Sequence, residues 1–585
     1  MATSYDQHPT IRLPQNVPIY EGRSAWDLVA DTARNRSIKP VVVIDCYPGV
    51  DVPELIEALA QAFDEWEIID VEARAARSGD DRESLVGRNL TSDRVFGIMS
   101  HFDVRDFYNT EELLAISEHV RKSERPTVLV GWGAALVGLE DSVVVLADMA
   151  RWEIQRRQRA GAPNWLADNA AEDPLRKFKR GYFVEWRMAD RHKKTLFDTL
   201  DFMLDTNRGA QDVKLIAGDV FRAGLELAAH RPFRVVPFFD PGVWGGQWMK
   251  TRLGLDAEPA NYAWCFDGVP EENSLLFESN GVVIEVPSID LVLSHPRDLV
   301  GERTFARFGA EFPIRFDFLD TMGGGNLSLQ VHPLTEYIKD QFGMAYTQDE
   351  SYYILDCGND AVVYLGVKNG VDREKMIRDL RVAAKGGAPF EADRYVNSFP
   401  ARKHDHFSIP AGTVHCSGAN SMVLEISATP YIFTFKLWDW GRLGLDGVPR
   451  PIHLDHGVAN IQWDRDTEWI ERELLDQVEV LSHHGDVLEE RTGLHVLEFI
   501  ETKRRWFSDS VSHDTRGTVN VLNLVEGDEV EVVSPTEAFD PFVIHYAETF
   551  IVPASVGPYV IRRTPRSESA RFATIEASVR GTRVD

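Results

Sequence analysis

Apolar residues in the first third of the chain fall into short continuous runs that alternate with helical patterns. Val41–Ile44, Thr127–Val130 and Val143–Leu146 are rich in β-branched residues and have the composition of buried strands. In the segment 51–63, apolar residues recur at the spacing of one helix face, which predicts a helix. Strands that alternate with helices indicate an α/β domain with a parallel sheet, which we place at residues 1–230.

The pattern changes from about residue 231 onward. Glycine, proline and aspartate now interrupt short apolar runs such as Gly281–Val286, Tyr352–Asp356 and Val519–Val525. Many short strands with frequent turns are typical of antiparallel barrels and sandwiches. We therefore expect two all-β domains, at residues 231–465 and 466–585.

Composition and charge narrow the class of protein. Apolar residues make up 44% of the chain and charged residues 26%, which is enough apolar surface for several packed cores. Lysine and arginine number 63 against 92 acidic residues, a net charge of −29, so we expect neither a nucleic-acid partner nor a membrane partner. There is no apolar leader and no run of 18 apolar residues, and the scattered cysteines form no CxxC pair; we expect a cytoplasmic protein without disulfides.

The predicted first all-β domain contains four residues of the types that bind metals. In a strand over Asn326–Pro333, Gln330 and His332 project to the same face. Glu350 begins another strand-like run, and His415 ends the sequence Ile-Pro-Ala-Gly-Thr-Val-His. One amide, two imidazoles and a carboxylate suit Zn²⁺, with Mn²⁺ or Fe²⁺ as alternatives. A lone strand histidine is more often a hydrogen-bonding residue, but the combination is more specific.

These motifs resemble a known family. Pro410–His415 is similar to the second cupin motif, and with Leu327–Pro333 and Asp349–Leu355 it resembles the type I mannose-6-phosphate isomerases over about residues 235–585. Further matching segments are Val243–Gly246, Phe316–Leu319, Thr434–Arg442, Arg450–His453 and Glu548–Ala554. The resemblance implies two cupin (jelly-roll) barrels and one divalent ion held by Gln330, His332, Glu350 and His415. Position 558, which corresponds to His415 in the last barrel, is proline, so we expect no second metal site.

The resemblance also implies an activity. It predicts a metal-dependent aldose–ketose isomerase that interconverts mannose 6-phosphate and fructose 6-phosphate through a cis-enediol, with a small-molecule sugar phosphate as its partner. Where the family has lysine two residues before the metal glutamate, this chain has Gln348, and the family's catalytic arginine aligns with Lys436. Lysine lacks the bidentate fork of arginine, so Arg442 is a second candidate for the catalytic cation. Glu425 and Asp439 are further ionisable residues here, and the base stays open between them.

The first third contains a strand, a loop and a helix in the order of a phosphate-binding loop. The loop itself, Asp45–Glu54, has one glycine, two prolines, no lysine and three acidic residues, and would repel a triphosphate. The strand at 143–146 and the arginine-rich helix after it resemble uridine-kinase-like P-loop proteins, so we interpret residues 1–230 as a degenerate domain of that kind. We interpret the basic residues at 176–180 as a solvated face. The alternative, which such clusters support less often, is a site for a phosphorylated ligand.

Two other functions remain open at this point. The Gln348 and Lys436 departures are also compatible with a non-catalytic sugar-phosphate sensor, whose pocket binds ligand without turnover. A bifunctional kinase–isomerase is the third hypothesis, and the lysine-free loop argues against it. The sequence does not indicate an oligomeric state.

Overall fold

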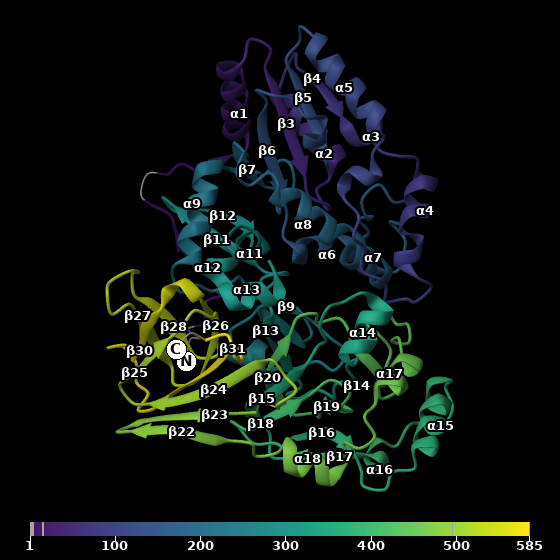
Figure 1. Cartoon of the computed structure of the whole chain (residues 1–585), viewed down its shortest axis with the longest axis vertical. Helices are drawn as coiled ribbons and strands as arrows, with labels where there is room; N and C mark the ends of the chain where they lie inside the picture. The colour runs from purple at the N-terminus through teal and green to yellow at the C-terminus, as the bar shows by residue number, and fades with distance from the viewer. Residues whose placement is uncertain (1–4, 15–16, 494, 584–585) are drawn as a thin grey trace. The chain divides into compact units, whose positions relative to one another are not determined.

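The computed structural model describes residues 5–14, 17–493 and 495–583, and its multidomain chain divides into two units. One unit comprises Pro9–Ala228 together with Pro270–His295. The other holds the described residues of 1–8, 229–269 and 296–585. Figure 1 shows both units, with the chain coloured from purple at the N-terminus to yellow at the C-terminus. The three-domain division at residues 230 and 465 stays a prediction.

A seven-stranded sheet forms the centre of the first unit, in the order β2-β8-β7-β6-β3-β5-β4. Strands β3 to β7 run parallel, and β8 joins β7 antiparallel. The strands are β2 (Tyr20–Glu21), β3 (Val41–Cys46), β4 (Glu67–Asp70), β5 (Thr127–Gly131), β6 (Val143–Asp148), β7 (Phe202–Asp205) and β8 (Lys214–Ala217). All three predicted strands and the parallel sheet are therefore present. The kinase-like assignment of this unit stays a prediction.

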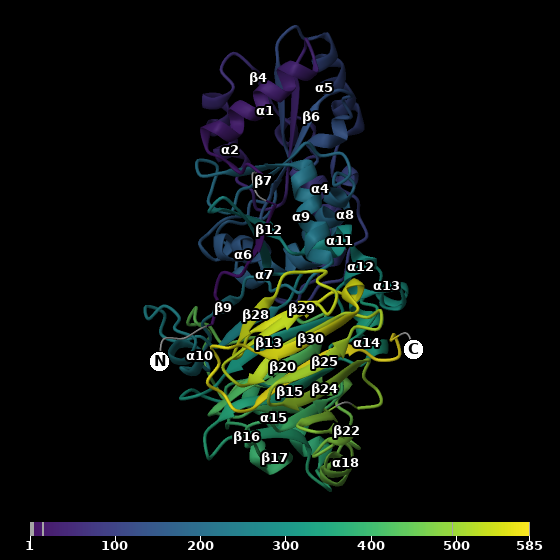
Figure 2. The same ribbon diagram turned by 90° about the vertical axis from the view of Figure 1, so that its left-hand side faces the viewer.

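Helices cover both faces of this sheet. The predicted helix is α2 (Val52–Ala62), which begins where the Asp51 side chain accepts a hydrogen bond from the Glu54 amide. Helices α1 (Arg23–Arg36) and α2 share one apolar core with β3, β5 and β6, and Figure 2 shows them on the side opposite α5 (Thr110–Lys122). The other helices are α3 (Val71–Ala75), α4 (Gly79–Leu90), α6 (Arg151–Arg159), α7 (Pro174–Arg180), α8 (Trp186–Lys194) and α9 (Gly218–Ala229).

A segment from later in the chain completes the same unit. Strands β11 (Ser274–Ser279) and β12 (Val282–Pro287) form a hairpin, and β11 pairs in parallel with β1 (Thr10–Arg12). Helix α11 (Ile289–Ser294) follows the hairpin. The run at 281–286 is thus a strand as predicted, but it belongs to the unit that holds the parallel sheet.

Two facing sheets in the second unit hold the predicted ligand residues. The first has the order β18-β15-β20-β13-β10-β9 and the second β17-β16-β19-β14-β21. The bounds of the first are β9 (Phe238–Asp240), β10 (Trp264–Gly268), β13 (Ile314–Asp320), β15 (Glu350–Cys357), β18 (His406–Ile409) and β20 (Ser421–Ala428). Those of the second are β14 (Leu329–Val331), β16 (Val362–Val367), β17 (Val396–Pro400), β19 (His415–Ser417) and β21 (Phe435–Trp438).

A second pair of antiparallel sheets follows in the same unit, with the orders β22-β23-β24-β31-β26-β29 and β25-β30-β27-β28. The strands are β22 (Glu479–His484), β23 (Val487–Arg491), β24 (Ile500–Phe507), β25 (Ser510–Asp514), β26 (Asn520–Glu526), β27 (Glu529–Val533), β28 (Phe542–His545), β29 (Thr549–Val552), β30 (Pro558–Arg563) and β31 (Phe572–Val579). Their inward residues form one apolar core. These sheets confirm a chain rich in β-structure, as the cupin resemblance predicts.

Short helices connect the strands of this unit. They are α10 (Trp248–Arg252), α12 (Pro296–Val300), α13 (Glu302–Phe308), α14 (Thr335–Phe342), α15 (Arg373–Ala384), α16 (Ala392–Tyr395), α17 (Leu454–Asn460) and α18 (Thr467–Glu473). No helix in the described part of the chain combines the length and the apolar character needed to cross a membrane.

Candidate metal centre and its pocket

His332, Glu350 and His415 form a buried cluster between the two facing sheets. The Glu350 carboxylate bridges the imidazoles, with Oε2 at 3.0 Å from His332 Nε2 and Oε1 at 2.7 Å from His415 Nε2. One ligand atom from each residue lies within 4.8 Å of the others, which is the spacing of a metal site. All three side chains are almost completely buried.

The opposite nitrogen of each imidazole is held by the backbone. His332 Nδ1 lies 3.0 Å from the Phe433 carbonyl oxygen, and His415 Nδ1 lies 2.8 Å from that of Thr413. A carbonyl can only accept, so both Nδ1 atoms carry the proton and both Nε2 atoms present a lone pair to the cluster.

Gln330 completes the set that the sequence predicts. In the second sheet it pairs with His415 on β19 and with Lys436 on β21, and its Nε2 lies 3.2 Å from His415 Nε2. The fit of a divalent ion is supported by buried His332 Nε2 and Glu350 Oε1, which lie at ion-pair distance from their neighbours but make no hydrogen bond of acceptable geometry. Two imidazoles, a carboxylate and an amide suit a borderline metal such as Zn²⁺.

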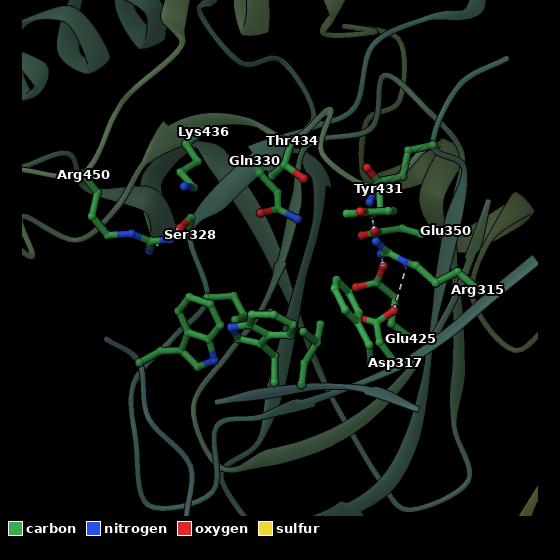
Figure 3. Close-up of a pocket in the computed structure, with 16 residues that line it drawn as sticks. Arg315, Asp317, Ser328, Gln330, Glu350, Glu425, Tyr431, Thr434, Lys436 and Arg450 are labelled. Carbon is green, nitrogen blue, oxygen red and sulfur yellow. Dashed lines mark hydrogen bonds and ion pairs between the residues drawn. The ribbon is translucent and has the colours of Figure 1, made fainter. Parts of the chain in front are cut away.

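A pocket of about 240 Å³ opens beside this cluster. Gln330 and Glu350 lie in its wall, and Trp244, Trp264 and Phe266 supply apolar surface. Figure 3 shows two polar ends, with Lys436, Ser328 and Arg450 on one side and Glu350, Tyr431, Arg315, Glu425 and Asp317 on the other. Convergent polar groups in a partly apolar concavity are typical of a small-molecule site.

Carboxylates dominate one end of the pocket. Burial raises the pKa of Asp317 to about 7, an effect that the Arg315 guanidinium opposes and Glu350 reinforces. Burial also raises the pKa of Glu425 well above its usual range, and the neighbouring Asp317 and Glu350 add to the shift. Strongly shifted carboxyl groups in a cleft are candidates for acid–base chemistry.

The other end carries cations. Lys436 lines the pocket from β21, next to Gln330. Arg450 donates to Asp439 Oδ2 at 2.9 Å and to Ser328 Oγ at 3.1 Å, and also lines the pocket. Arg442 is not among its lining residues; it donates to Asp439 Oδ1 and to the Asn326 carbonyl oxygen, each at 2.6 Å. The catalytic roles of Lys436 and Arg442 stay predictions, and only Lys436 faces the pocket.

Two further residues of the pocket wall either depart from the family's motifs or lie outside them. Gln348 is buried there with its side-chain amide beside the Glu350 carboxylate, so a neutral group stands where the resembled isomerases have lysine. Arg315 was missed altogether, because it lies outside the recognised motifs. Its alternation with Asp317 in the apolar strand β13 was the available signal.

The basic residues at 176–180 in the first unit are held inside the fold. The solvated-face interpretation is wrong, because Lys177, Lys179 and Arg180 are buried. Lys177 donates to the carbonyls of Ala162 and Ala170, and the Arg180 guanidinium pairs with Glu185 at 3.0 Å. Their donors are used in the interior rather than at the surface.

The edge of the parallel sheet where the strands end is filled by internal ion pairs. Lys193 lies between Asp148 at 2.9 Å and Asp290 at 2.6 Å, and all three are buried. Asp45, in the loop compared with a phosphate cradle, accepts from the Ala135 amide and lies 3.0 Å from His192 Nε2. Ligands of doubly wound sheets bind at this edge, and here the chain's own side chains occupy it.

Comparison with known proteins identifies relatives that match part of this chain. Mannose-6-phosphate isomerase ManA of Bacillus subtilis (strain 168) is 27% identical over 232 residues, which is 40% of this chain and 68% of that protein. Mannose-6-phosphate isomerase of Streptococcus mutans is 26% identical over 218 residues, 37% of this chain and 63% of that protein. These homologues are named mannose-6-phosphate isomerases. The chain thus spans about two thirds of the length of the relatives it matches.

The first unit and the solved structures add two further findings. A family model described as "Domain of unknown function (DUF8485)" matches residues 25–230. The crystal structure of mannose 6-phosphate isomerase from Bacillus subtilis covers 60% of this chain and 99% of its own at a TM-score of 0.47 and 17% identity. A mutant of phosphomannose isomerase from Salmonella typhimurium covers 59% and 99% at a TM-score of 0.44 and 15% identity.

Proposed function

We propose that this protein is a metal-dependent aldose–ketose isomerase that interconverts mannose 6-phosphate and fructose 6-phosphate. The observation that carries the proposal is one pocket whose wall includes part of the buried His332–Glu350–His415 cluster, a carboxylate end and a cationic end. The homologues' names support a sugar phosphate as the substrate.

The cationic end is suited to the phosphate group. Arg450, fixed by Asp439, presents a guanidinium beside the Ser328 hydroxyl for the phosphate, whereas Lys436, next to Gln330, supplies a point charge for the reacting sugar oxygens. Anchoring the phosphate there places the other end of the sugar toward Gln330 and Glu350. A divalent ion held by Gln330, His332, Glu350 and His415, with Zn²⁺ the expected one, supplies Lewis-acid stabilisation of the charge that develops on the sugar oxygens.

Glu425 is our candidate for the proton-carrying base. Its Oε1 accepts hydrogen bonds from Arg315 Nη2 and from Ser427 Oγ, which leaves Oε2 for the pocket. Oε2 takes the proton from C2 of the open-chain aldose as the C2–H bond breaks, the electron pair forms the C1=C2 bond of the enediol, and the C1 oxygen takes up the proton that the C2 hydroxyl releases. The carboxylic acid then returns its proton to C1 as the C1–H bond and the C2=O bond form, so no oxidant or reductant is consumed.

The test is turnover of a panel of aldose 6-phosphates by the zinc-loaded protein. We expect fructose 6-phosphate to form from mannose 6-phosphate faster than ketoses form from the other aldose phosphates. Conversion of a different aldose phosphate only would reassign the substrate. Micromolar binding of mannose 6-phosphate without turnover would refute the isomerase and favour the sugar-phosphate sensor, which the neutral Gln348 beside Glu350 makes the second candidate.

A further inference from the structure

Six polar side chains form a regular array on the pocket-facing side of β13, β20 and β15. Strand pairing aligns them in two rows across the sheet, first Arg315–Ser427–Glu350 and then Asp317–Glu425–Tyr352. One member, Glu350, belongs to the candidate metal cluster. The next row, Leu319–Val423–Ile354, is apolar. The array is therefore a confined polar patch in an otherwise apolar interior, and burying it is costly unless its members satisfy one another.

Arg315 connects the members of this array. Its Nη2 donates to Glu425 Oε1, and its Nε lies 3.0 Å from Ser427 Oγ and 3.1 Å from Asp317 Oδ1. Because Ser427 Oγ also donates to Glu425 Oε1 at 2.9 Å, two donors aim at the same carboxylate oxygen. The guanidinium also lies over the Tyr431 ring at 5.2 Å, which restricts its plane. A planar fork held in this way fixes the direction of the Glu425 carboxylate.

Asp317 changes the charge that Glu425 experiences. A buried arginine beside one carboxylate would favour its ionised form and make it a poor proton acceptor. Here Asp317 stands directly opposite Glu425 on the neighbouring strand and shares the same guanidinium. Two adjacent carboxylates with one cation retain affinity for one proton, which a group that must take up and return a proton requires.

We propose that Arg315 and Asp317 are positioning residues for Glu425, Arg315 aiming its free oxygen into the pocket and Asp317 preserving its ability to accept a proton. This inference rests on the proposed isomerase function. The competing explanation is that Arg315 only neutralises buried carboxylates, in which case any cation of suitable length replaces it.

A matched control exists elsewhere in the same unit. Arg234 is also buried between two carboxylates, with Nη1 2.8 Å from Glu548 Oε1 and Nη2 3.6 Å from Asp267 Oδ1, and it lies over the Tyr5 ring. It is not among the lining residues of the pocket. Arg234→Lys therefore makes the same chemical change in a similar environment away from the proposed chemistry.

The experiment compares the full-length, zinc-loaded wild type with Arg315→Lys, Asp317→Asn and Arg234→Lys by kcat, KM, bound zinc and Tm. We expect Arg315→Lys and Asp317→Asn to lower kcat about 10- to 100-fold, with KM and zinc content within about threefold of wild type. Arg234→Lys should leave kcat within about twofold. In a Glu425→Gln background, Arg315→Lys should cost less than about a further twofold, because its effect acts through Glu425.

The outcomes are distinguishable. A wild type without any turnover refutes the proposed function, and this inference with it. An active wild type with a fully active Arg315→Lys variant refutes this inference alone. The inference is also refuted if Arg315→Lys lowers kcat only in proportion to lost zinc or to a Tm loss that Arg234→Lys shares, or if its full effect persists in the Glu425→Gln background.

Discussion

Replacing Lys193 with methionine should strongly destabilise the unit that holds the parallel sheet. The Lys193 ammonium is the cation shared by Asp148 at 2.9 Å and Asp290 at 2.6 Å, and it also lies 4.4 Å from the centre of the Tyr47 ring. All of these side chains are buried. Methionine fills a similar volume but leaves two carboxylates without a counter-charge.

The expected loss follows from the burial of the ion pairs. Removing one partner of a buried pair costs about 3–5 kcal/mol, because the remaining charge stays desolvated. For domains of about 150–250 residues, 1 kcal/mol lowers Tm by about 2–4 °C, so we expect a loss of ~6–20 °C. Asp290→Asn should cost less, because it leaves Lys193 paired with Asp148.

Thermal unfolding of the full chain, followed by near-ultraviolet circular dichroism and differential scanning calorimetry, measures this effect. Lys39→Met in the same unit is the control, because the Lys39–Glu124 pair lies on the surface and should contribute less than about 1 kcal/mol. Bound zinc should be unchanged in both variants. A Tm loss for Lys193→Met no larger than that for Lys39→Met would refute the account of this sheet edge.

Four further outcomes are expected. His415→Ala should keep the fold but lose bound metal by elemental analysis; full metal content with full activity would exclude His415 as a ligand. Lys436→Ala should lower kcat at least about 10²-fold with metal retained, and Lys436→Arg should keep activity; normal turnover of Lys436→Ala beside an inactive Arg442→Ala would show that Arg442 is the catalytic cation. Calorimetric titration with Mg-ATP should detect no binding below millimolar concentrations, because the loop at 45–54 lacks lysine and is acidic; micromolar affinity would contradict this. Burial raises the pKa of Glu72 to about 7 from an ordinary 4.5, so its ionisation destabilises the fold increasingly as the pH rises from 4.5 through 7. Glu72→Gln should therefore stabilise the protein by up to about 3 kcal/mol above pH ~7 and little below pH ~4.5; equal effects at the two ends of this range would contradict the burial argument.

The local pattern of apolar residues was sufficient to predict much of the fold, because strands and helices each require a characteristic spacing of apolar residues along the sequence. The apolar runs at 41–44, 127–130 and 143–146 became adjacent parallel strands, and Asp51 capped the predicted helix. The run at 281–286 was found as a strand, but nothing local could assign its partner. Its place in the first unit depends on contacts between segments that lie far apart in the sequence.

In the candidate site, too, the local sequence pattern predicts some features, and others depend on contacts between distant segments. Motif spacing selected His332, Glu350 and His415, and the structure brings them together. The role of a charged residue depends on its partners, which spacing does not reveal. Arg315 escaped notice because its partner Glu425 lies 110 positions away, and Lys177 was assigned to solvent although backbone carbonyls accept its protons in the interior.

The most direct test of the account is the isomerisation of mannose 6-phosphate by one preparation before and after metal removal. The stripped protein should be inactive, and adding Zn²⁺ should restore fructose 6-phosphate formation in proportion to bound metal, to about one ion per chain. A His332→Ala protein treated identically should recover no activity. Equal turnover with and without metal, or none by a fully loaded and folded protein, would contradict the central claim.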